Sequence, residues 1–431
     1  MKPGACPFAP AGLLLLLCAA AWNAPLPAPW NLWLVPGLAL LALLVGLFCG
    51  GYPARLWLAV AIGLGWIALY AGNASHDWSA GRGPLPVAHI LWLPASANAE
   101  GTWGTFRLAL AAAAAFALGA RLTPRQIRGV QALALAAGVA MAFVVLFQRL
   151  EPNQPRIREY TGIFVNENHF AVFSNLLLPV VLVMASRARF RAVQDGKPSS
   201  PAGLLILAAL LMATAVVLCG SRAGVAVMAL LVATHVWTAH RVVRAYPFAG
   251  VPISAWLKTL GWVGVATAAG FAVRAFWREW TQWATIGKEW TFRSGILKDA
   301  LAAWKEQPVW GVGPGTFSAV FPLYQSETFA GKSILHAHCE PVQLLMETGW
   351  AGALVLAAAV GLGLTLRARR AAAPSDEIPP FADCERRAFG FAILACALHC
   401  LIDFPLRIPL LTLLTAAWLG LWTGTRPQKG G

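Results

Sequence analysis

Long runs of apolar residues alternate along the chain with short polar segments. Each run approaches the roughly 20 residues that an α-helix needs to cross the hydrocarbon core of a bilayer. The pattern therefore predicts about twelve transmembrane helices. The runs lie near residues 8–23, 32–49, 55–72, 103–120, 128–147, 168–185, 202–219, 223–239, 256–274, 341–366, 387–402 and 408–425.

The composition agrees with an integral membrane protein. Hydrophobic residues make up 58% of the 431 positions, and only 12% of the positions are charged. Apolar residues spread over many long runs do not fit a soluble single domain, a disordered chain or a disulfide-stapled scaffold. The predicted fold class is all-α, a polytopic transmembrane helical bundle of about 12 spans.

Positive charges predict how the helices are oriented. The chain has 33 Lys and Arg against 18 Asp and Glu. Most of the positive residues lie in short connections between apolar runs, so they indicate membrane orientation and not binding of nucleic acid. Because more of them fall on the side that holds the N-terminus, both termini are predicted to be cytoplasmic. The first run is short enough for a signal peptide, but this topology needs it as a retained helix.

One long polar segment, residues 275–340, separates the ninth and tenth predicted spans on the outer side. Long loops cross the membrane largely regardless of their charge. We therefore expect three parts. Residues 1–274 hold spans 1–9, residues 275–340 form the outer loop with catalytic residues, and residues 341–431 hold spans 10–12, with a cytoplasmic linker near 367–386.

A first polar cluster precedes and begins the sixth predicted span. Arg158, Asn166, Asn168 and His169 lie within it. Guanidinium, amide and imidazole groups beside a helix N-terminus favour a phosphate ligand. The alternative is that Asn166 or Asn168 only caps the helix.

A second cluster is the tight turn GSRAG, which contains Arg222, between the seventh and eighth spans. Its side chain either extends to lipid headgroups or clamps a phosphate, because a guanidinium stays protonated and binds phosphate oxygens through two donors.

In the outer loop, GVGPGTF from Gly311 to Phe317 predicts a turn and not a nucleotide-binding loop, because it lacks the required strand and Lys-Ser/Thr pair.

The strongest cluster comes directly before the tenth span. His336, His338 and Glu340 alternate along the chain there. A neutral imidazole can take a proton from a hydroxyl near pH 7, so His338 is the candidate general base. Two alternatives remain, a metal site formed by the three side chains and plain helix capping.

A last group lies at the end of the eleventh span. His399 and Asp403 are four residues apart, so they are predicted to share a helix face, and Arg407 follows. Ionisable groups inside a membrane normally face the bundle interior. Structural pairing and a supporting role behind the site are equally open for these residues.

The combined motifs resemble the bacterial O-antigen ligase and O-antigen polymerase family. The resemblance spans roughly residues 156–410, and its pieces occur in the family's order. They are VNENHFA from Val165, GSRAG from Gly220, the segment from Arg293 through GVGPGTF, HAHCEPVQLLMETGWAG from His336, and LIDFPLRIP near the C-terminus.

The resemblance implies a fold and a chemistry. Members resemble the lipid-sugar (GT-C-like) glycosyltransferases in fold, with the long outer loop forming part of a periplasmic cavity. They resemble metal-independent transferases without a cofactor, whose donor is a glycan on undecaprenyl diphosphate. By this resemblance His338 activates the acceptor hydroxyl, while Arg222 and Arg293 hold the diphosphate.

The expected function is transfer of a glycan from undecaprenyl diphosphate to an acceptor hydroxyl, on lipid A core or a similar glycan, at the periplasmic face of the bacterial inner membrane. Expected partners are this donor, the acceptor and membrane lipids, and no nucleic acid. The further expected substrate-binding residues are Arg158, Asn166, Asn168, His169, His336 and Glu340, with His399, Asp403 and Arg407 behind them.

Two alternatives stay open. An O-antigen or exopolysaccharide polymerase would share the donor chemistry and differ in its acceptor. A small-anion transporter would use the outward arginines for its substrate, although the charged residues cluster at the outer face and transport sites usually lie near mid-membrane.

Overall fold

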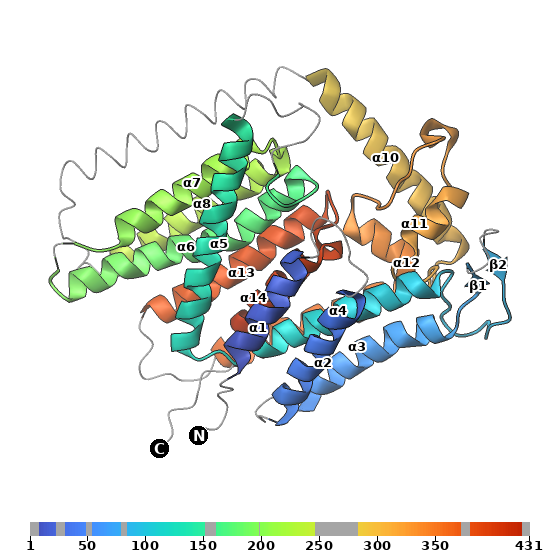
Figure 1. The fold of residues 1–431 in the computed structure, drawn as a ribbon, viewed down its shortest axis with the longest axis horizontal. Helices are drawn as coiled ribbons and strands as arrows, with labels where there is room; N and C mark the ends of the chain where they lie inside the picture. The colour runs from blue at the N-terminus through green and yellow to red at the C-terminus, as the bar shows by residue number, and fades with distance from the viewer. Residues whose placement is uncertain are drawn as a thin grey trace. The chain divides into compact units, whose positions relative to one another are not determined.

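The computed structural model describes residues 8–22, 31–48, 54–78, 84–150, 161–197, 199–245, 283–371 and 380–424. These residues are mostly helical, with one small two-stranded hairpin (Figure 1). The predicted all-α class is therefore confirmed for the described part of the chain.

Every predicted apolar run within the described residues forms a helix, while the ninth run, 256–274, lies outside them. The α-helices are α1 (Ala9–Trp22), α2 (Asn31–Phe48), α3 (Ala54–Gly72), α4 (Ala99–Gly119), α5 (Pro124–Leu150), α6 (Glu167–Gln194), α7 (Ala202–Leu218), α8 (Arg222–Ala245), α10 (Trp283–Glu306), α11 (Phe317–Val320), α12 (Glu340–Ala371), α13 (Pro380–Cys400) and α14 (Pro409–Thr423). The short elements are β1 (His76–Asp77), β2 (Leu85–Pro86) and the 3₁₀ helices η1 (Phe321–Leu323), η2 (Glu327–Phe329) and η3 (Pro405–Arg407).

The described helices include four that are long and apolar enough to cross a membrane, in α4, α5, α6 and α12. Six further apolar helices have shorter apolar stretches, namely those in α1, α2, α3, α7, α8 and α14. These helices mark a membrane protein, and the count of about twelve spans remains a prediction.

The chain forms two compact units. The first contains α1–α4, most of α10, α11, α12 and α14, and in it α4 packs against α2, α3 and α14. Small residues allow the backbones of α4 and α14 to approach closely. A Cβ atom added at Gly119 would lie 2.5 Å from the Ala417 carbonyl oxygen, and one at Gly420 would lie 2.2 Å from the Phe116 carbonyl oxygen.

Residues 283–339, called the outer segment after the location predicted for them, have their own apolar core. Buried side chains of α10, α11 and η1 meet there, among them Ile296, Phe317 and Phe321, and Met346 of α12 joins them. The rings of Phe317 and Phe321 stack with centroids 4.7 Å apart. This core fixes the segment that leads into the polar cluster before α12.

The helix α12 is interrupted at Gly349, which has φ 59° and ψ −163°. The chain before the GVGPGTF turn enters this break: the N–H of Trp350 donates to the Pro308 carbonyl at 2.9 Å and that of Ala351 to the Val309 carbonyl at 3.1 Å. Glycine is needed at the break, because a Cβ atom there would lie 2.3 Å from the Val309 oxygen.

The GVGPGTF segment is a turn, as predicted, and its glycines make it a docking element. The N–H groups of Val312 and Gly313 donate to the carbonyls of Met346 and Glu347, at 3.1 and 2.8 Å. Gly311 has φ 68°, and a Cβ atom there would lie 2.5 Å from the Glu347 carbonyl carbon. The turn thus joins the outer segment to α12 through backbone contacts.

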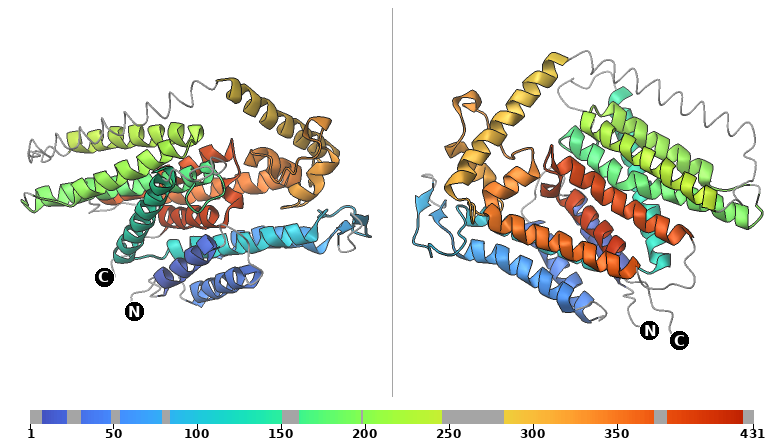
Figure 2. Two further views of the ribbon diagram at one scale, coloured as in Figure 1. Left: turned by 45° about the horizontal axis from the view of Figure 1, so that its top comes forward. Right: turned by 180° about the vertical axis from the view of Figure 1, so that it is seen from behind.

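The second unit contains α5–α8 and nearly all of α13. The helix α6 lies beside α7 and α8, and both views of Figure 2 show the three together. Apolar residues of α8 and α13 pack against one another, with Val227, Leu231 and Ala395 buried between these helices.

Candidate functional site

His338 has the backbone conformation that L-residues rarely adopt. Its φ is 52°, and it is the one non-glycine residue with positive φ in the described part of the chain. Such a conformation costs on the order of 1 kcal/mol or more and persists only where the surroundings hold it. The side chain is half-buried at the end of the segment that leads into α12.

The imidazole of His338 is oriented by a carboxylate. Its Nδ1 atom lies 3.2 Å from Oδ1 of Asp403. Asp403 follows α13 and precedes η3 in the sequence, and it is fully buried. The same Oδ1 accepts the Phe404 N–H at 3.0 Å. A carboxylate that accepts the Nδ1–H fixes one tautomer of a neutral imidazole, in which Nε2 is the proton acceptor.

An aromatic ring separates and positions the two histidines. Phe404 stacks on His336, with ring centroids 4.0 Å apart, and meets His338 edge to face at 5.0 Å. Because Phe404 follows Asp403 directly, one short segment supplies both the carboxylate and the ring.

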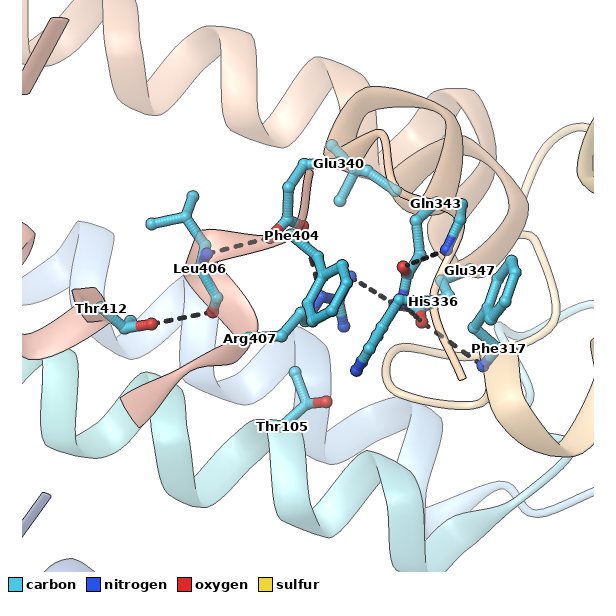
Figure 3. A network of polar contacts seen from close by, with 12 residues as sticks. Thr105, Phe317, His336, Glu340, Gln343, Glu347, Phe404, Leu406, Arg407 and Thr412 are labelled. Carbon is cyan, nitrogen blue, oxygen red and sulfur yellow. Dashed lines mark hydrogen bonds and ion pairs between the residues drawn. The ribbon is translucent and has the colours of Figure 1, made fainter. Parts of the chain in front are cut away.

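Beside His336 and Phe404 lies a network of one guanidinium and two carboxylates (Figure 3). Arg407 donates from Nη2 to Glu347 at 2.8 Å and from Nε to Glu340 at 3.3 Å. Glu340 also accepts the Leu406 N–H at 3.0 Å. The two carboxylates raise the pKa of Arg407 above its usual value, although burial acts against this rise. The guanidinium therefore stays charged.

Gln343 connects this network to the histidines. Its amide group donates to Glu347 at 2.9 Å, accepts the Ala337 N–H at 3.1 Å and lies 3.5 Å from Nδ1 of His336. Glu347 also accepts the Phe317 N–H of α11 at 3.4 Å. The network thus joins α12, the segment before it, α11 and η3.

Gln343, Glu347 and Phe404 were not among the residues expected from the sequence. A signal for two of them exists, because Glu340, Gln343 and Glu347 follow the i, i+3, i+7 spacing of one helix face in an otherwise apolar stretch. Figure 3 shows these side chains on the side of α12 that faces Arg407.

The three side chains of the alternative metal site have separate partners. His336 stacks on Phe404, His338 contacts Asp403 and Glu340 pairs with Arg407. Within the described residues no group of three His, Cys, Asp or Glu side chains could hold a metal ion.

Arg293 belongs to the first unit and lies on α10. Its Nη1 donates to the carbonyl of Ile402, next to Asp403 in the sequence. A guanidinium has five N–H donors, so this bond anchors the side chain and leaves other donors for a ligand.

A cavity of about 450 Å³ extends from the Arg407 network between α3, α4 and α12. Its walls are mainly apolar, with residues such as Leu64 and Ile67 of α3, Leu108 of α4 and Val355 of α12. The polar network thus lies at one end of an apolar space.

In the second unit the motifs VNENHFA and GSRAG assemble. Ser221 donates to the buried Asn168 at 2.6 Å, and Asn175 donates to the Gly224 carbonyl at 3.0 Å. A Cβ atom added at Gly224 would lie 2.3 Å from the Ala171 side chain, so glycine permits this close approach.

Asn166 and Asn168, two of the expected residues of this cluster, have hydrogen-bond partners within the protein. Asn166 is the N-cap of α6 and accepts the Asn168 N–H at 2.7 Å, which agrees with the capping alternative for this residue. His169 is buried in the first turn of α6. Arg222 begins α8 and is half-buried. Arg158 lies outside the described residues.

The shared helix face predicted for His399 and Asp403 is wrong. The helix α13 ends at Cys400, and a turn precedes Asp403. His399 is fully buried in the second unit, where its Nε2 lies 3.3 Å from the amide nitrogen of Asn175. The four-residue spacing is helical only if the helix continues, and here it does not.

A comparison with known families identifies one domain. The family model described as O-antigen ligase matches residues 207–357. The matched stretch includes Arg222, Arg293, His336, His338 and Glu340. This match confirms the resemblance predicted from the motifs. No curated protein matches the chain.

Proposed function

Because residues 207–357 match the O-antigen ligase family model, we propose that the protein transfers a glycan from undecaprenyl diphosphate to the hydroxyl of an acceptor, lipid A core or a similar glycan. The reaction takes place at the periplasmic face of the bacterial inner membrane and serves lipopolysaccharide assembly. The observation that carries this proposal is the contact between His338 and the buried carboxylate of Asp403.

His338 is the general base in this proposal. With Nδ1–H held by Asp403, Nε2 takes the proton of the acceptor hydroxyl, and the oxygen forms a bond to the anomeric carbon of the donor sugar. The bond from that carbon to the diphosphate breaks, and undecaprenyl diphosphate leaves with the electron pair. Asp403 stabilises the imidazolium that forms on His338.

Arginine side chains stabilise the leaving diphosphate. Arg293 is anchored at one N–H group, so its remaining donors are available without a large loss of side-chain freedom. By the resemblance of the sequence motifs, we propose the same role for Arg222. Fixed guanidinium groups supply positive charge to a diphosphate directly, so the proposed reaction needs no metal ion.

The Arg407 network supports the base without contacting the donor phosphate. Two carboxylates already neutralise this guanidinium, which disfavours a further anion there. The apolar cavity beyond the network suits the hydrocarbon part of a lipid substrate. These features favour a lipid-linked glycan over a small anion as the substrate.

The base assignment is tested on the purified protein by the initial rate of glycan transfer. We expect His338→Ala to lower the rate by about 10²–10⁴-fold. The control is Glu327→Ala, at an exposed residue of η2, which should transfer glycan at the wild-type rate. Normal transfer by His338→Ala would contradict the assignment.

The lipid-linked glycans of cells that lack this protein distinguish ligase from polymerase. Mass spectrometry of the undecaprenyl-linked pool measures their chain length. Accumulated long polymers support the ligase, because polymerisation proceeds and transfer does not. Accumulated single repeats support the polymerase, and an unchanged pool contradicts both.

A further inference from the structure

A second cavity lies in the first unit and does not include His338, Asp403 or Arg407 in its lining. Its walls are the connection between α3 and α4 on one side and residues 306–324 of the outer segment on the other. Its volume is about 360 Å³. Small-molecule sites occupy roughly 300–1,000 Å³, so the space suits a ligand of limited size.

Asn73 fixes residues 90–94, a described part of the connection between α3 and α4. The buried amide of Asn73 donates to the carbonyls of Ile90 and Pro94 at 3.0 and 3.1 Å, and its oxygen accepts the Ile90 N–H at 2.8 Å. The Ala97 N–H donates to the Val312 carbonyl at 2.8 Å, which ties this connection to the glycine-rich turn. The cavity is therefore preformed, and a ligand loses little affinity to ordering of its walls.

Two tryptophans present fixed aromatic surfaces to the cavity. The indole N–H of Trp78 donates to the Ala97 carbonyl at 2.6 Å, and about a third of Trp78 (36%) is exposed. Trp310 packs against Trp66 with ring centroids 5.5 Å apart, and its carbonyl accepts the Tyr70 hydroxyl at 2.5 Å. An aromatic face carries partial negative charge, which attracts the C–H groups of a sugar ring.

Two polar side chains of the cavity, Glu306 and His89, can accept hydrogen bonds from a ligand. Tyr324 donates to Oε2 of Glu306 at 2.5 Å, and burial together with this carboxylate raises the pKa of Tyr324 to about 12. The carboxylate thus keeps Oε1 for a ligand. His89 contacts the Val87 carbonyl through Nδ1 at 3.1 Å. A carbonyl only accepts, so Nδ1 donates, and in the neutral ring Nε2 is an acceptor.

These groups argue against three other ligand classes. The negative charge of Glu306 repels a phosphate or diphosphate. A metal ion lacks a set of ligands, because no three His, Cys, Asp or Glu side chains gather in the described part of the chain. An alkyl chain would offer no further hydrogen bond to Oε1 of Glu306 or to Nε2 of His89, side chains that each have one other atom bonded within the protein. A neutral ring with several hydroxyl donors satisfies all of these groups.

We propose that this cavity binds sugar rings of the glycan, as a subsite separate from the His338 site, between the fixed faces of Trp78 and Trp310 and the acceptors Glu306 and His89. The proposal rests on the function proposed above. Gly311 and Val312 line the cavity, and Val312 and the adjoining Gly313 bond to the backbone of α12. The subsite is thus coupled through the glycine-rich turn to the helix that carries Glu340 and Glu347.

Binding of free oligosaccharides to the full-length protein in detergent tests the proposal. One probe is the glycan released by mild acid from the undecaprenyl-linked pool of the same cells, and the other is the core oligosaccharide released from their lipopolysaccharide. Each is labelled at its reducing end and titrated by fluorescence anisotropy. Saturable binding of the first assigns the subsite to the donor glycan, and binding of the second assigns it to the acceptor.

Two variants report on the cavity, and each has a matched control. We expect Trp78→Ala and Glu306→Gln to weaken binding about tenfold or more, the effect of one lost stacking or charged hydrogen-bond contact. The controls are Trp92→Ala, a 75% exposed tryptophan of the same connection outside the cavity, and Glu327→Gln in η2. Glu306→Gln keeps the side-chain volume and the bond from Tyr324, so it decides the question even where Trp78→Ala does not fold.

The binding measurement does not depend on the transfer reaction. His338→Ala is expected to bind the oligosaccharide as tightly as the wild type. Failure of the base assignment, seen in the transfer rate, is therefore distinguishable from failure of the subsite proposal, seen in the binding titration. The proposal is overturned when neither labelled oligosaccharide binds saturably to the wild type. It is also overturned when Glu306→Gln binds with unchanged affinity.

Discussion

His338 and Asp403 are 65 positions apart in the sequence, yet Nδ1 of the one lies 3.2 Å from Oδ1 of the other. Each residue lies just outside a helix, His338 before α12 and Asp403 after α13. The pair places an imidazole with a defined tautomer beside a carboxylate that has no exposed surface. The strength of His338 as a base therefore depends on Asp403, which need not touch the substrate.

We expect Asp403→Asn to lower kcat by about 10²-fold and to leave KM nearly unchanged. The amide keeps the shape of the carboxylate but loses the charge that stabilises a protonated His338. Initial rates of glycan transfer at several acceptor concentrations give both constants. Asp195→Asn, at an exposed pair with Lys197, is the control and should behave as the wild type.

Replacement of His338 by glycine should give a more stable protein than replacement by alanine, and both variants should lose most of the transfer activity. Glycine adopts a φ of 52° without steric cost, and alanine does not. We therefore expect His338→Gly to exceed His338→Ala by about 1 kcal/mol in stability. The midpoints of thermal unfolding of the two purified variants make the comparison, and equal midpoints would show that the backbone at this position is unstrained.

Loss of Glu347 should destabilise the first unit strongly. Its side chain is 1% exposed and holds Arg407, Gln343 and the Phe317 N–H together. Removal of one partner of a buried ion pair costs about 3–5 kcal/mol, and we expect this loss for Glu347→Ala. Glu340→Ala should cost less, because Glu340 is more exposed, at 12%. Thermal unfolding of both variants shows which substitution lowers the stability more. A smaller loss of stability for Glu347→Ala than for Glu340→Ala would contradict the central role of Glu347 in the network.

Gly311 and Gly331 have similar φ angles, yet their replacement by alanine should lower the stability by different amounts. Gly311 and Gly331 have φ of 68° and 74°, but only Gly311 has backbone atoms where the new Cβ atom would lie. We expect Gly331→Ala to cost about 1 kcal/mol from strain alone. Gly311→Ala should cost at least about 3 kcal/mol, because the turn must separate from α12. The amount of folded protein recovered in detergent and its unfolding midpoint test the difference.

The helices outside residues 275–340 are predictable because each contains a long apolar run, whereas α10 and α11 form within that polar segment. The run near 202–219 becomes α7 (Ala202–Leu218), and the run near 408–425 becomes α14 (Pro409–Thr423). A bilayer requires a minimum length of apolar helix, so length and composition suffice for these elements.

The partners within the site are not predictable in the same way. His338, Asp403 and Arg407 are recognisable as candidates by their polar chemistry in apolar surroundings. Their pairing depends on where α13 ends, and the spacing of His399 and Asp403 predicts a longer helix than the one that forms. Phe404 gives no signal, because one more aromatic residue in an apolar chain is unremarkable in sequence.

The break in α12 sets an order of events during synthesis of the protein. The N–H groups of Trp350 and Ala351 bond to carbonyls of the outer segment, at Pro308 and Val309. In a bilayer a backbone donor without a partner costs several kcal/mol. The ribosome makes residues 283–339 before α12, and in the topology predicted from the sequence they cross the membrane. In that topology α12 is complete only after these residues have been exported, so completion of the helix depends on their export.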